Sequence, residues 1–443
     1  MKRPSSLFSR LRENFKLLLL WFRPGIGVKR WFGLMLLGTT MLAVGLTIFL
    51  KDIYYQAPEG WQSTILATTS LQAFPRLTRA LIFGGIGVAC VVIGILRLNR
   101  TLMRPFLQPG KPVVNALMQY SRLDRGPNVA VIGGGHGMST VLRGLKKYTR
   151  NLTAIVTVAD DGGSSGKLRE SKGMLPPGDI RNCLAALSSD EDLTSQLFQY
   201  RFSAGDERLE GHSFGNLLIS ALAEITGSFE QAVVEAGRVL SASGQVVPST
   251  LHDVRLVADK SLPHVQREVR IKGESQIPGI TGKVRRLWLE PNAPPAYPAA
   301  VKALLQADMI VVGPGSLYTS ILPNLLVPDI VAAMRASHAF KVFVCNVTTQ
   351  PGETDNYDCR DHLRAIEEHV DDHLFDLVVS NCTYLSALPE NLQWVAAPPE
   401  LDEDYAVYRA DLTREDNPLR HDGDKLARVL IDLFMERTGP LVV

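Results

Sequence analysis

The architecture expected for this chain follows from one short segment, Val129-Ala-Val-Ile-Gly-Gly-Gly-His-Gly-Met-Ser-Thr140. Four apolar residues predict a strand, and the apolar spacing from Val141 to Leu145 predicts a helix after the glycines. A glycine turn between a strand and a helix leaves backbone N–H groups and the positive helix end at one point. We therefore expect an anion site at Gly133, Gly134, Gly135, His136, Gly137, Met138 and Ser139. The segment has no Walker lysine, and a tight turn that packs without a ligand is the alternative.

Later segments repeat the pattern of a short apolar run that ends in a polar or glycine-rich turn. They are Ala154 to Val158, Met309 to Val312, Val342 to Cys345 and Leu377 to Ser380. Continuous apolar strands separated by helical stretches predict a mainly parallel sheet with helices on both faces. The predicted fold class is therefore α/β and Rossmann-like, and such sheets bind ligands at the C-terminal edge of their strands.

The stretch from about 244 to 295 differs from the rest. It contains His252-Asp-Val-Arg255, a charged run from Lys260 to Lys272, and several Pro and Gly residues. We expect an inserted β-rich subdomain or lid there, within a body that spans residues 127–443. An amphipathic helix near residues 425–435 ends this body.

A second motif follows the strand that begins at Ala154. Asp160 and Asp161 can bind a pair of hydroxyls, hold Mg²⁺ or act as a base. The small residues after them can form an anion nest, and the candidate ligand residues are Gly162, Gly163, Ser164, Ser165, Gly166 and Arg169. An acidic turn that caps a helix is the alternative.

Two further motifs begin helices. Pro176-Pro177-Gly178 predicts a rigid turn, Asp179 is expected to cap the helix that starts at Ile180, and Arg181 and Asn182 lie in its first turn. An arginine there opposes the helix dipole, which favours an anionic partner. The other motif places His212, Ser213 and Asn216 at the mouth of an apolar helix, where Ser213 as a plain N-cap is the alternative.

Two more strand ends carry polar turns. The first supplies Gly313, Gly315, Ser316, Tyr318 and Thr319, and the second supplies Asn346 and Gln350. Ordinary strand-end loops are the alternative for both. His369 and His373 have metal-like spacing on an acidic helix, but we expect a solvated face and no metal site. Cys183 lies in an apolar helix and is expected in the core.

The N-terminal part of the chain has a different composition. Residues 1–126 carry 17 Lys and Arg against 4 Asp and Glu, while residues 127–443 carry 30 against 41. Residues 31–50 contain no charge and residues 80–96 form a second apolar run, so we expect two transmembrane helices. The basic flanks predict that the N-terminus and the main domain are cytoplasmic, with residues 51–79 outside. A buried core helix or a signal peptide is the alternative.

Composition also excludes several classes. With 46% hydrophobic and 21% charged residues, the chain is neither collagen-like nor wholly disordered. Five scattered cysteines without a CxxC pair argue against a disulfide framework or a zinc ribbon. The basic run from Arg267 to Arg286 is modest, so we expect no nucleic-acid partner.

Six of these motifs together resemble the gluconeogenesis factor (YvcK-like) family, which is related to the CofD-like 2-phospho-L-lactate transferases of deazaflavin coenzyme synthesis. They are GGGHG, ADDGGSSGKLR, LPPGDIRN, GHSFGNLLI, GPGSLYTSILPNLLV and CNVTTQPGETD, in this order over roughly residues 127–385. His136 departs from the family pattern, which has a small Thr there. The predicted membrane segment is an addition to the family body.

The resemblance implies a site for a nucleotide sugar such as UDP-N-acetylglucosamine, and a role in carbon partitioning, cell-wall synthesis and cell shape. Three functions are open. The first is a membrane-tethered regulator that needs no cofactor, in which Gly133 to Gly137 and Ser164 to Gly166 hold the diphosphate and Tyr318 contacts the ligand. It would form a homo-oligomer or bind a cell-wall-synthesis protein. The second is a Mg²⁺-dependent transferase that uses Asp160 or Asp161. The third is a nicotinamide-dependent oxidoreductase, which the Asp-Asp-Gly-Gly-Ser-Ser turn fits poorly.

Overall fold

The computed structural model describes residues 123–189, 193–203, 209–262, 267–370, 373–384 and 388–438, with scattered positions before residue 123. The chain divides into two units, Met1–Arg122 and Leu123–Val443. Apart from those scattered positions, the two predicted membrane spans lie outside the described residues. Over the described residues no single helix has the length and apolar composition of a membrane span, and one bent pair, Leu317–Leu325 with Pro328–Ala336, passes on those two criteria alone.

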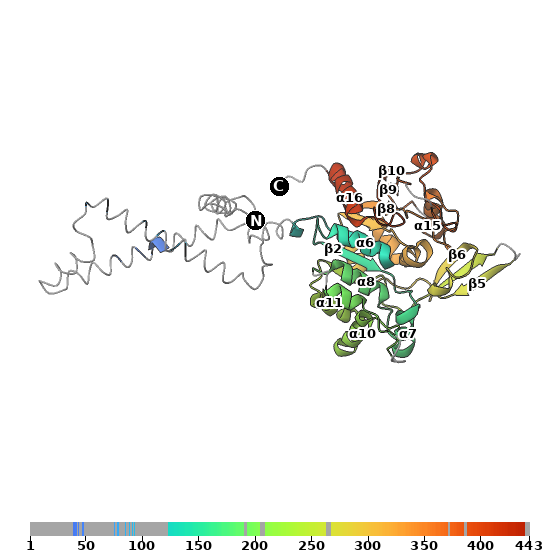
Figure 1. Cartoon of the computed structure of the whole chain (residues 1–443), viewed down its shortest axis with the longest axis horizontal. Helices are drawn as coiled ribbons and strands as arrows, with labels where there is room; N and C mark the ends of the chain where they lie inside the picture. Colours follow the sequence, from blue (N-terminus) through green and yellow to red (C-terminus); the bar gives the residue numbers. More distant parts are fainter. Residues whose placement is uncertain are drawn as a thin grey trace, which may run out of the picture. The chain divides into compact units, whose positions relative to one another are not determined.

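Seven parallel strands form the large sheet in the order β10-β9-β8-β7-β1-β2-β3 (Figure 1). Their bounds are β1 Val129–Gly133, β2 Leu152–Val156, β3 Gln245–Pro248, β7 Met309–Val312, β8 Phe340–Val344, β9 Leu377–Asn381 and β10 Val407–Ala410. The strand order reverses between β1 and β7, which makes this pair the topological switch point of the sheet. The predicted Rossmann-like α/β class is therefore confirmed.

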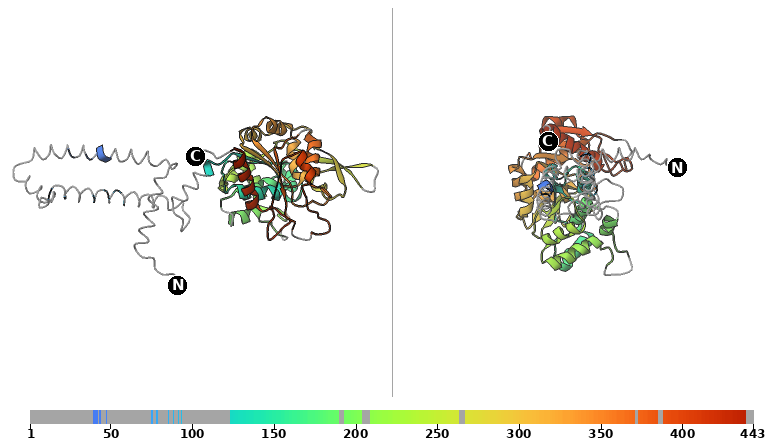
Figure 2. Two further views of the ribbon diagram at one scale, coloured as in Figure 1. Left: turned by 90° about the horizontal axis from the view of Figure 1, so that it is seen from above. Right: turned by 90° about the vertical axis from the view of Figure 1, so that its left-hand side faces the viewer.

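Helices cover both faces of this sheet (Figures 1 and 2). The helices of the body are α6 Gly135–Leu145, α7 Gly163–Lys172, α8 Gly178–Leu187, α9 Leu193–Gln199, α10 Phe214–Thr226, α11 Phe229–Val239, α12 Pro298–Gln306, α13 Leu322–Leu325, α14 Pro328–Ala336, α15 Cys359–Val370 and α16 Gly423–Thr438. Short helical turns lie at η2 Glu274–Gln276, η3 Leu317–Ile321 and η4 Pro399–Glu403.

The core has two parts because successive side chains of a strand point to opposite faces. On β1, Val129 and Val131 pack with α6, α8 and α16, whereas Ala130 and Ile132 pack with α12, α14 and α15. All four side chains are almost fully buried. Burial on both faces explains why these strands read as unbroken apolar runs in the sequence.

A small antiparallel sheet, β5-β4-β6, forms most of the stretch that differs in composition. Its strands are β4 Arg255–Ser261, β5 Glu268–Lys272 and β6 Lys283–Glu290, and β5 and β6 project from the body (Figure 1). The expected lower boundary near residue 244 needs a correction, because β3 pairs with β2 in the large sheet. The inserted sheet therefore begins at Arg255.

Candidate functional site

Four helices begin beside the switch point. α6 follows β1 directly, α7 follows β2, and α8 and α10 begin at Gly178 and Phe214. A helix N-terminus carries partial positive charge and unpaired N–H groups, so this edge of the sheet attracts anions. We call it the switch-point edge and define it by residues 133–139, 160–169, 177–182, 212–216 and 313–319.

The glycine turn after β1 packs against two neighbours. A Cβ added to Gly137 would lie 2.4 Å from the carbonyl oxygen of Pro314, and one added to Gly134 would lie 2.5 Å from Oδ2 of Asp179. Gly135 has a φ of 62°, and its N–H donates to the Asp179 carboxylate. The glycines therefore permit close approach, and one of the predicted free N–H groups is already used.

The role expected for Asp179 changes accordingly. α8 begins at Gly178 with Pro177 as its N-cap, so Asp179 lies in the first turn and does not cap the helix. Its side chain reaches across to the glycine turn of α6. The prediction failed because the rigid Pro176-Pro177-Gly178 turn starts the helix earlier than the capping pattern suggested.

Three partly buried carboxyl groups gather at the switch-point edge. Burial raises the pKa of Asp160, whose Oδ1 accepts a hydrogen bond from the Gly162 N–H at 2.9 Å. Burial and the neighbouring Asp160 raise the pKa of Asp179 to about 7. Burial, with Asp160 and Asp179 nearby, raises the pKa of Glu274 in η2 to about 8. Near neutral pH, Asp179 and Glu274 are therefore only partly ionised.

Asp161 holds the small sheet against this edge. Its Oδ1 accepts a hydrogen bond from the backbone N–H of Ser275 at 2.9 Å. Among the described residues, no group of three His, Cys, Asp or Glu side chains is placed to hold a metal ion. A Mg²⁺ ion at this edge would therefore need further oxygen ligands, such as the phosphates of a substrate.

Arg181 is the most informative side chain of the site. It is 4% exposed, and its guanidinium donates to Ser213 Oγ and, at 2.9 Å, to Asn182 Oδ1. Its Nε has no hydrogen-bond partner within the described structure, and no carboxylate among the described residues hydrogen-bonds the group. Burial, with Arg201 nearby, lowers the pKa of Arg181 to about 10. The negative charges of Asp179 and Asp160 oppose this lowering, but neither carboxylate hydrogen-bonds the guanidinium, so the group can still pair with an anion.

Arg169 shows the opposite situation. Its side chain is buried, and its Nε donates to Asp253 Oδ1 at 2.7 Å while its terminal nitrogen also contacts Val254 O. This guanidinium already has a carboxylate partner, and the ligand contact expected for it stays a prediction. Arg169 ties α7 to the loop before β4.

Hydrogen bonds of Ser164 connect the N-termini of α7 and α10. Its Oγ accepts from Asn216 Nδ2 at 3.0 Å and lies 3.1 Å from Nδ1 of His212. Burial, with Lys167 nearby, lowers the pKa of His212, so its ring is mainly neutral at pH 7. Ser213 accepts from the Asn216 N–H at 3.3 Å, which confirms it as the N-cap of α10.

Arginines surround His136 at the glycine turn. Burial is the main cause of the lowered pKa of His136. The positive charges of four arginines lower it further: Arg420, Arg181, Arg143 and Arg201. The sequence motifs identified only one of these arginines, Arg181. Arg420 lies far along the chain in a loop without a glycine-rich motif, so no local signal marked it.

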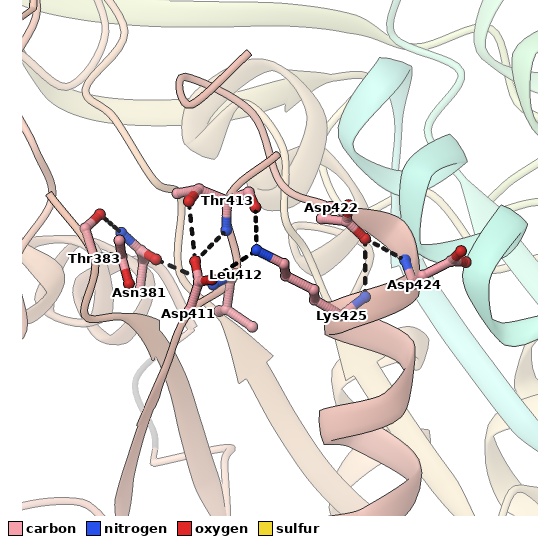
Figure 3. Close-up of polar contacts among 8 residues, drawn as sticks. All are labelled: Asn381, Thr383, Asp411, Leu412, Thr413, Asp422, Asp424 and Lys425. Carbon is pink, nitrogen blue, oxygen red and sulfur yellow. Dashed lines mark hydrogen bonds and ion pairs between the residues drawn. The ribbon is translucent and has the colours of Figure 1, made fainter. Parts of the chain in front are cut away.

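A polar network holds the loop that carries Arg420 (Figure 3). Lys425 Nζ donates to Asp411 Oδ2 at 2.6 Å and to the carbonyl oxygen of Thr413 at 2.9 Å. The N–H of Leu412 donates to Asn381 Oδ1 at 3.2 Å. Both ends of the loop are therefore attached to regular elements, β9 and α16, which fixes its course beside the switch point.

The α16 end of this loop has its own cap (Figure 3). Asp422 Oδ1 accepts the backbone N–H groups of Asp424 at 2.8 Å and Lys425 at 2.9 Å. The neighbouring His421 is buried, and its Nε2 lies 3.1 Å from the carbonyl oxygen of Cys345 at the end of β8. Arg420 therefore directly precedes a residue whose side chain is fixed in the fold.

Asn346 and Gln350 support the turn after β7. Asn346 accepts from the Gly315 N–H at 3.0 Å and donates to its carbonyl oxygen at 2.8 Å. Gln350 Nε2 donates to Ser316 Oγ at 2.8 Å, while its buried Oε1 has no partner in the described structure. Both predicted residues therefore lie at the site and position the Gly313–Ser316 turn.

Tyr318 corrects a further expectation. Its side chain is 1% exposed and packs in the core, with its hydroxyl 2.8 Å from that of Tyr357 and its ring against His369. Thr319 is buried as well and donates to Glu353 Oε1 at 3.2 Å. The hydroxyl-bearing residues after the glycine turn thus enter η3 and turn inward, a direction that residue type does not reveal.

Two remaining expectations are settled by packing. Cys183 is fully buried beside Met138, as predicted. His369 does not lie on a solvated face, because its Nε2 accepts the backbone N–H of Leu287 at 3.0 Å and its Nδ1 contacts the carbonyl of Ala365. Both ring nitrogens are used within the fold.

The fold and the switch-point edge define a Rossmann-like α/β protein with an anion-attracting site. The family model of "2-phospho-L-lactate transferase CofD" matches residues 129–417. The "Gluconeogenesis factor" of Bacillus subtilis is 42% identical over 320 residues, which cover 70% of this chain and 99% of that protein. The chain belongs to the gluconeogenesis factor family, which is related to CofD.

Other relatives differ in how much of the chain they match. A protein of Nostoc sp. is 44% identical over 445 residues, which cover 96% of this chain and 93% of that one. A crystal structure of a UPF0052 family member from Bacillus halodurans superimposes with a TM-score of 0.65 at 40% identity, and covers 69% of this chain and 99% of that one. The N-terminal segment is therefore shared with the Nostoc protein, whereas the solved relative corresponds in length to the body alone.

Proposed function

We propose that the switch-point edge binds a nucleotide sugar of the UDP-N-acetylglucosamine type, and that the protein acts as a regulator through this binding. The observation that carries the proposal is the buried guanidinium of Arg181, whose Nε has no hydrogen-bond partner and which no carboxylate hydrogen-bonds within the described structure. A diphosphate supplies the missing negative charge, and guanidinium groups bind phosphate oxygens with two parallel hydrogen bonds. Arg420 extends the same positive region along the glycine turn, beside His136, whose lowered pKa favours the neutral ring.

The parts of the ligand can be assigned by chemistry. The diphosphate fits the N-termini of α6 and α7, where Gly163 has a φ of 48° and no atom within 4 Å of an added Cβ. Asp160 is the carboxylate proposed for ribose or sugar hydroxyls, because it lies between the glycine-rich start of α7 and the Arg169 and Asp179 groups; one of its oxygens also accepts the Gly162 N–H. In this proposal the bound state acts in carbon partitioning, cell-wall synthesis and cell shape through a homo-oligomer or a cell-wall-synthesis protein.

A Mg²⁺-dependent transferase of a phosphate-bearing group is the second candidate. The raised pKa of Asp160 favours it, since a carboxyl group that titrates nearer neutral pH suits an acid or base. In that case Asp160 takes the proton of the acceptor hydroxyl, and substrate phosphates supply the remaining oxygen ligands of Mg²⁺.

Asp160→Asn separates the two candidates. For a regulator we expect the wild type to leave UDP-N-acetylglucosamine intact with or without Mg²⁺, and the variant to bind it at least about tenfold more weakly through the lost hydroxyl contact. Overnight incubation followed by chromatography and calorimetry measures both quantities. Ligand breakdown by the wild type that disappears in Asp160→Asn, with affinity retained, would establish the transferase.

We also propose that residues 31–50 and 80–96 anchor the body to the cell membrane with the body in the cytoplasm. Their length and the basic flanks support this. The full chain is then expected to sediment with membranes and to resist carbonate extraction, whereas a variant lacking residues 1–122 stays in the supernatant. Full-length protein released by carbonate alone would contradict the anchor.

A further inference from the structure

Lys260 has an unusual environment for an ammonium group. It lies on β4, and its side chain is fully buried. Its Nζ donates to three backbone carbonyl oxygens, those of Ile277, Ile280 and Gly352. A buried lysine is rare, and here all three of its protons hold main-chain carbonyls.

The three carbonyls belong to two different loops. Ile277 and Ile280 lie between β5 and β6 of the small sheet, whereas Gly352 lies in the loop after β8. The loops approach closely at Gly352, which has a φ of 78° and where an added Cβ would lie 2.1 Å from the carbonyl oxygen of Pro278. Lys260 therefore fastens the small sheet to the loop after β8.

That loop in turn supports the turn after β7. Gln350 Nε2 donates to Ser316 Oγ at 2.8 Å. Glu353 accepts the N–H of Tyr318 at 3.3 Å and the hydroxyl of Thr319 at 3.2 Å. A continuous chain of contacts thus runs from Lys260 to the Gly313–Ser316 turn at the switch point.

The small sheet also reaches the site from its other side. Ser275 in η2 donates to Asp161, and the partly buried Glu274 lies near Asp160 and Asp179. The sheet is therefore attached to both halves of the switch-point edge, through Asp161 on the β2 side and through Lys260 on the β7 side.

We propose that Lys260 is a positioning residue that couples the small sheet to the switch-point edge, and so sets the turn after β7 for ligand binding. The proposal rests on the nucleotide-sugar site described above. Lys260 itself is fully buried on β4 and acts through Gly352, Gln350 and Glu353. A purely structural lysine would affect stability without changing the turn.

Lys260→Met tests this in the full chain, because it keeps the length of the side chain and removes its donors. We expect amide hydrogen exchange of residues 316–321 and 350–355 to become at least about tenfold faster in the ligand-free protein, while β1 and β2 keep their protection. The Kd for UDP-N-acetylglucosamine is expected to rise about tenfold. Gly352→Ala breaks the same contact from the other side and should give the same pattern. In the double variant, its effects on exchange and on the Kd should not add to those of Lys260→Met.

Leu304→Ala serves as the matched control, since Leu304 is buried on α12 and belongs to neither loop. At an equal loss of Tm it should leave the Kd and the exchange of residues 316–321 unchanged. If Lys260→Met and Gly352→Ala behave like Leu304→Ala, the proposal is overturned. If the wild type binds no UDP-sugar, the proposed function fails, and the exchange rates of the ligand-free variants still decide the role of Lys260.

Discussion

Replacement of Arg181 by Met should weaken binding of UDP-N-acetylglucosamine by about 100-fold, which corresponds to roughly 2.7 kcal/mol. The guanidinium is 4% exposed and hydrogen-bonds only neutral side chains within the described structure. A ligand phosphate would be its only close negative partner at hydrogen-bonding distance. Its removal therefore takes away the strongest contact that the site offers to an anion.

The same change should leave stability nearly intact. A buried charge without an ion pair opposes folding, and the lowered pKa of Arg181, about 10, reflects that cost. We expect the free energy of unfolding to change by less than about 1 kcal/mol. Arg238→Met, at an exposed residue of α11, is the control and should alter neither quantity. Unchanged affinity in Arg181→Met would show that the anion binds elsewhere.

Asp179→Asn should stabilise the protein, and more so at alkaline pH. Burial and Asp160 raise the pKa of Asp179 from 3.8 in the unfolded chain to about 7 in the folded protein. The folded state therefore binds more protons between these values, and stability falls as pH rises from about 4 to about 7. Asparagine does not titrate, so the variant avoids this loss of stability, and its side-chain oxygen can still accept the Gly135 N–H.

From this shift, the gain in the free energy of unfolding is expected to be larger at pH 8 than at pH 5 by about 2 to 3 kcal/mol. Urea unfolding at the two pH values measures it. Asp416→Asn is the control, because the pKa of this exposed group is lowered by Arg414 and the variant should gain nothing. An equal gain for Asp179→Asn at both pH values would mean that Asp179 titrates normally.

The sequence predicted the large sheet well for a physical reason. Strands such as Val129–Gly133 and Met309–Val312 are buried on both faces, so every position is apolar and the run stands out. The carboxyl ends of parallel strands lie at one edge, which is why motifs far apart in sequence, at Gly133 and Asn346, were expected to meet there. Both do lie at the switch point.

The parts of the site that escaped prediction depend on contacts between distant segments. Arg420 reaches the glycine turn because Lys425, Asp422 and Asn381 fix its loop, and none of these forms a recognisable motif. Glu274 comes from the inserted sheet. The direction in which a side chain points is the other difficulty, since Tyr318 turns into the core within η3. Residue type and spacing do not encode either property.

Calorimetric titration of residues 123–443 tests the central claim most directly. This unit is compact by itself, and a solved relative of matching length folds without the N-terminal segment. UDP-N-acetylglucosamine, NAD and GDP would each be titrated with and without Mg²⁺. We predict that only the UDP-sugar binds tightly, that it needs no metal, and that Arg181→Met weakens this binding by about 100-fold. Preferential binding of NAD, or no binding of any of the three, would contradict the account.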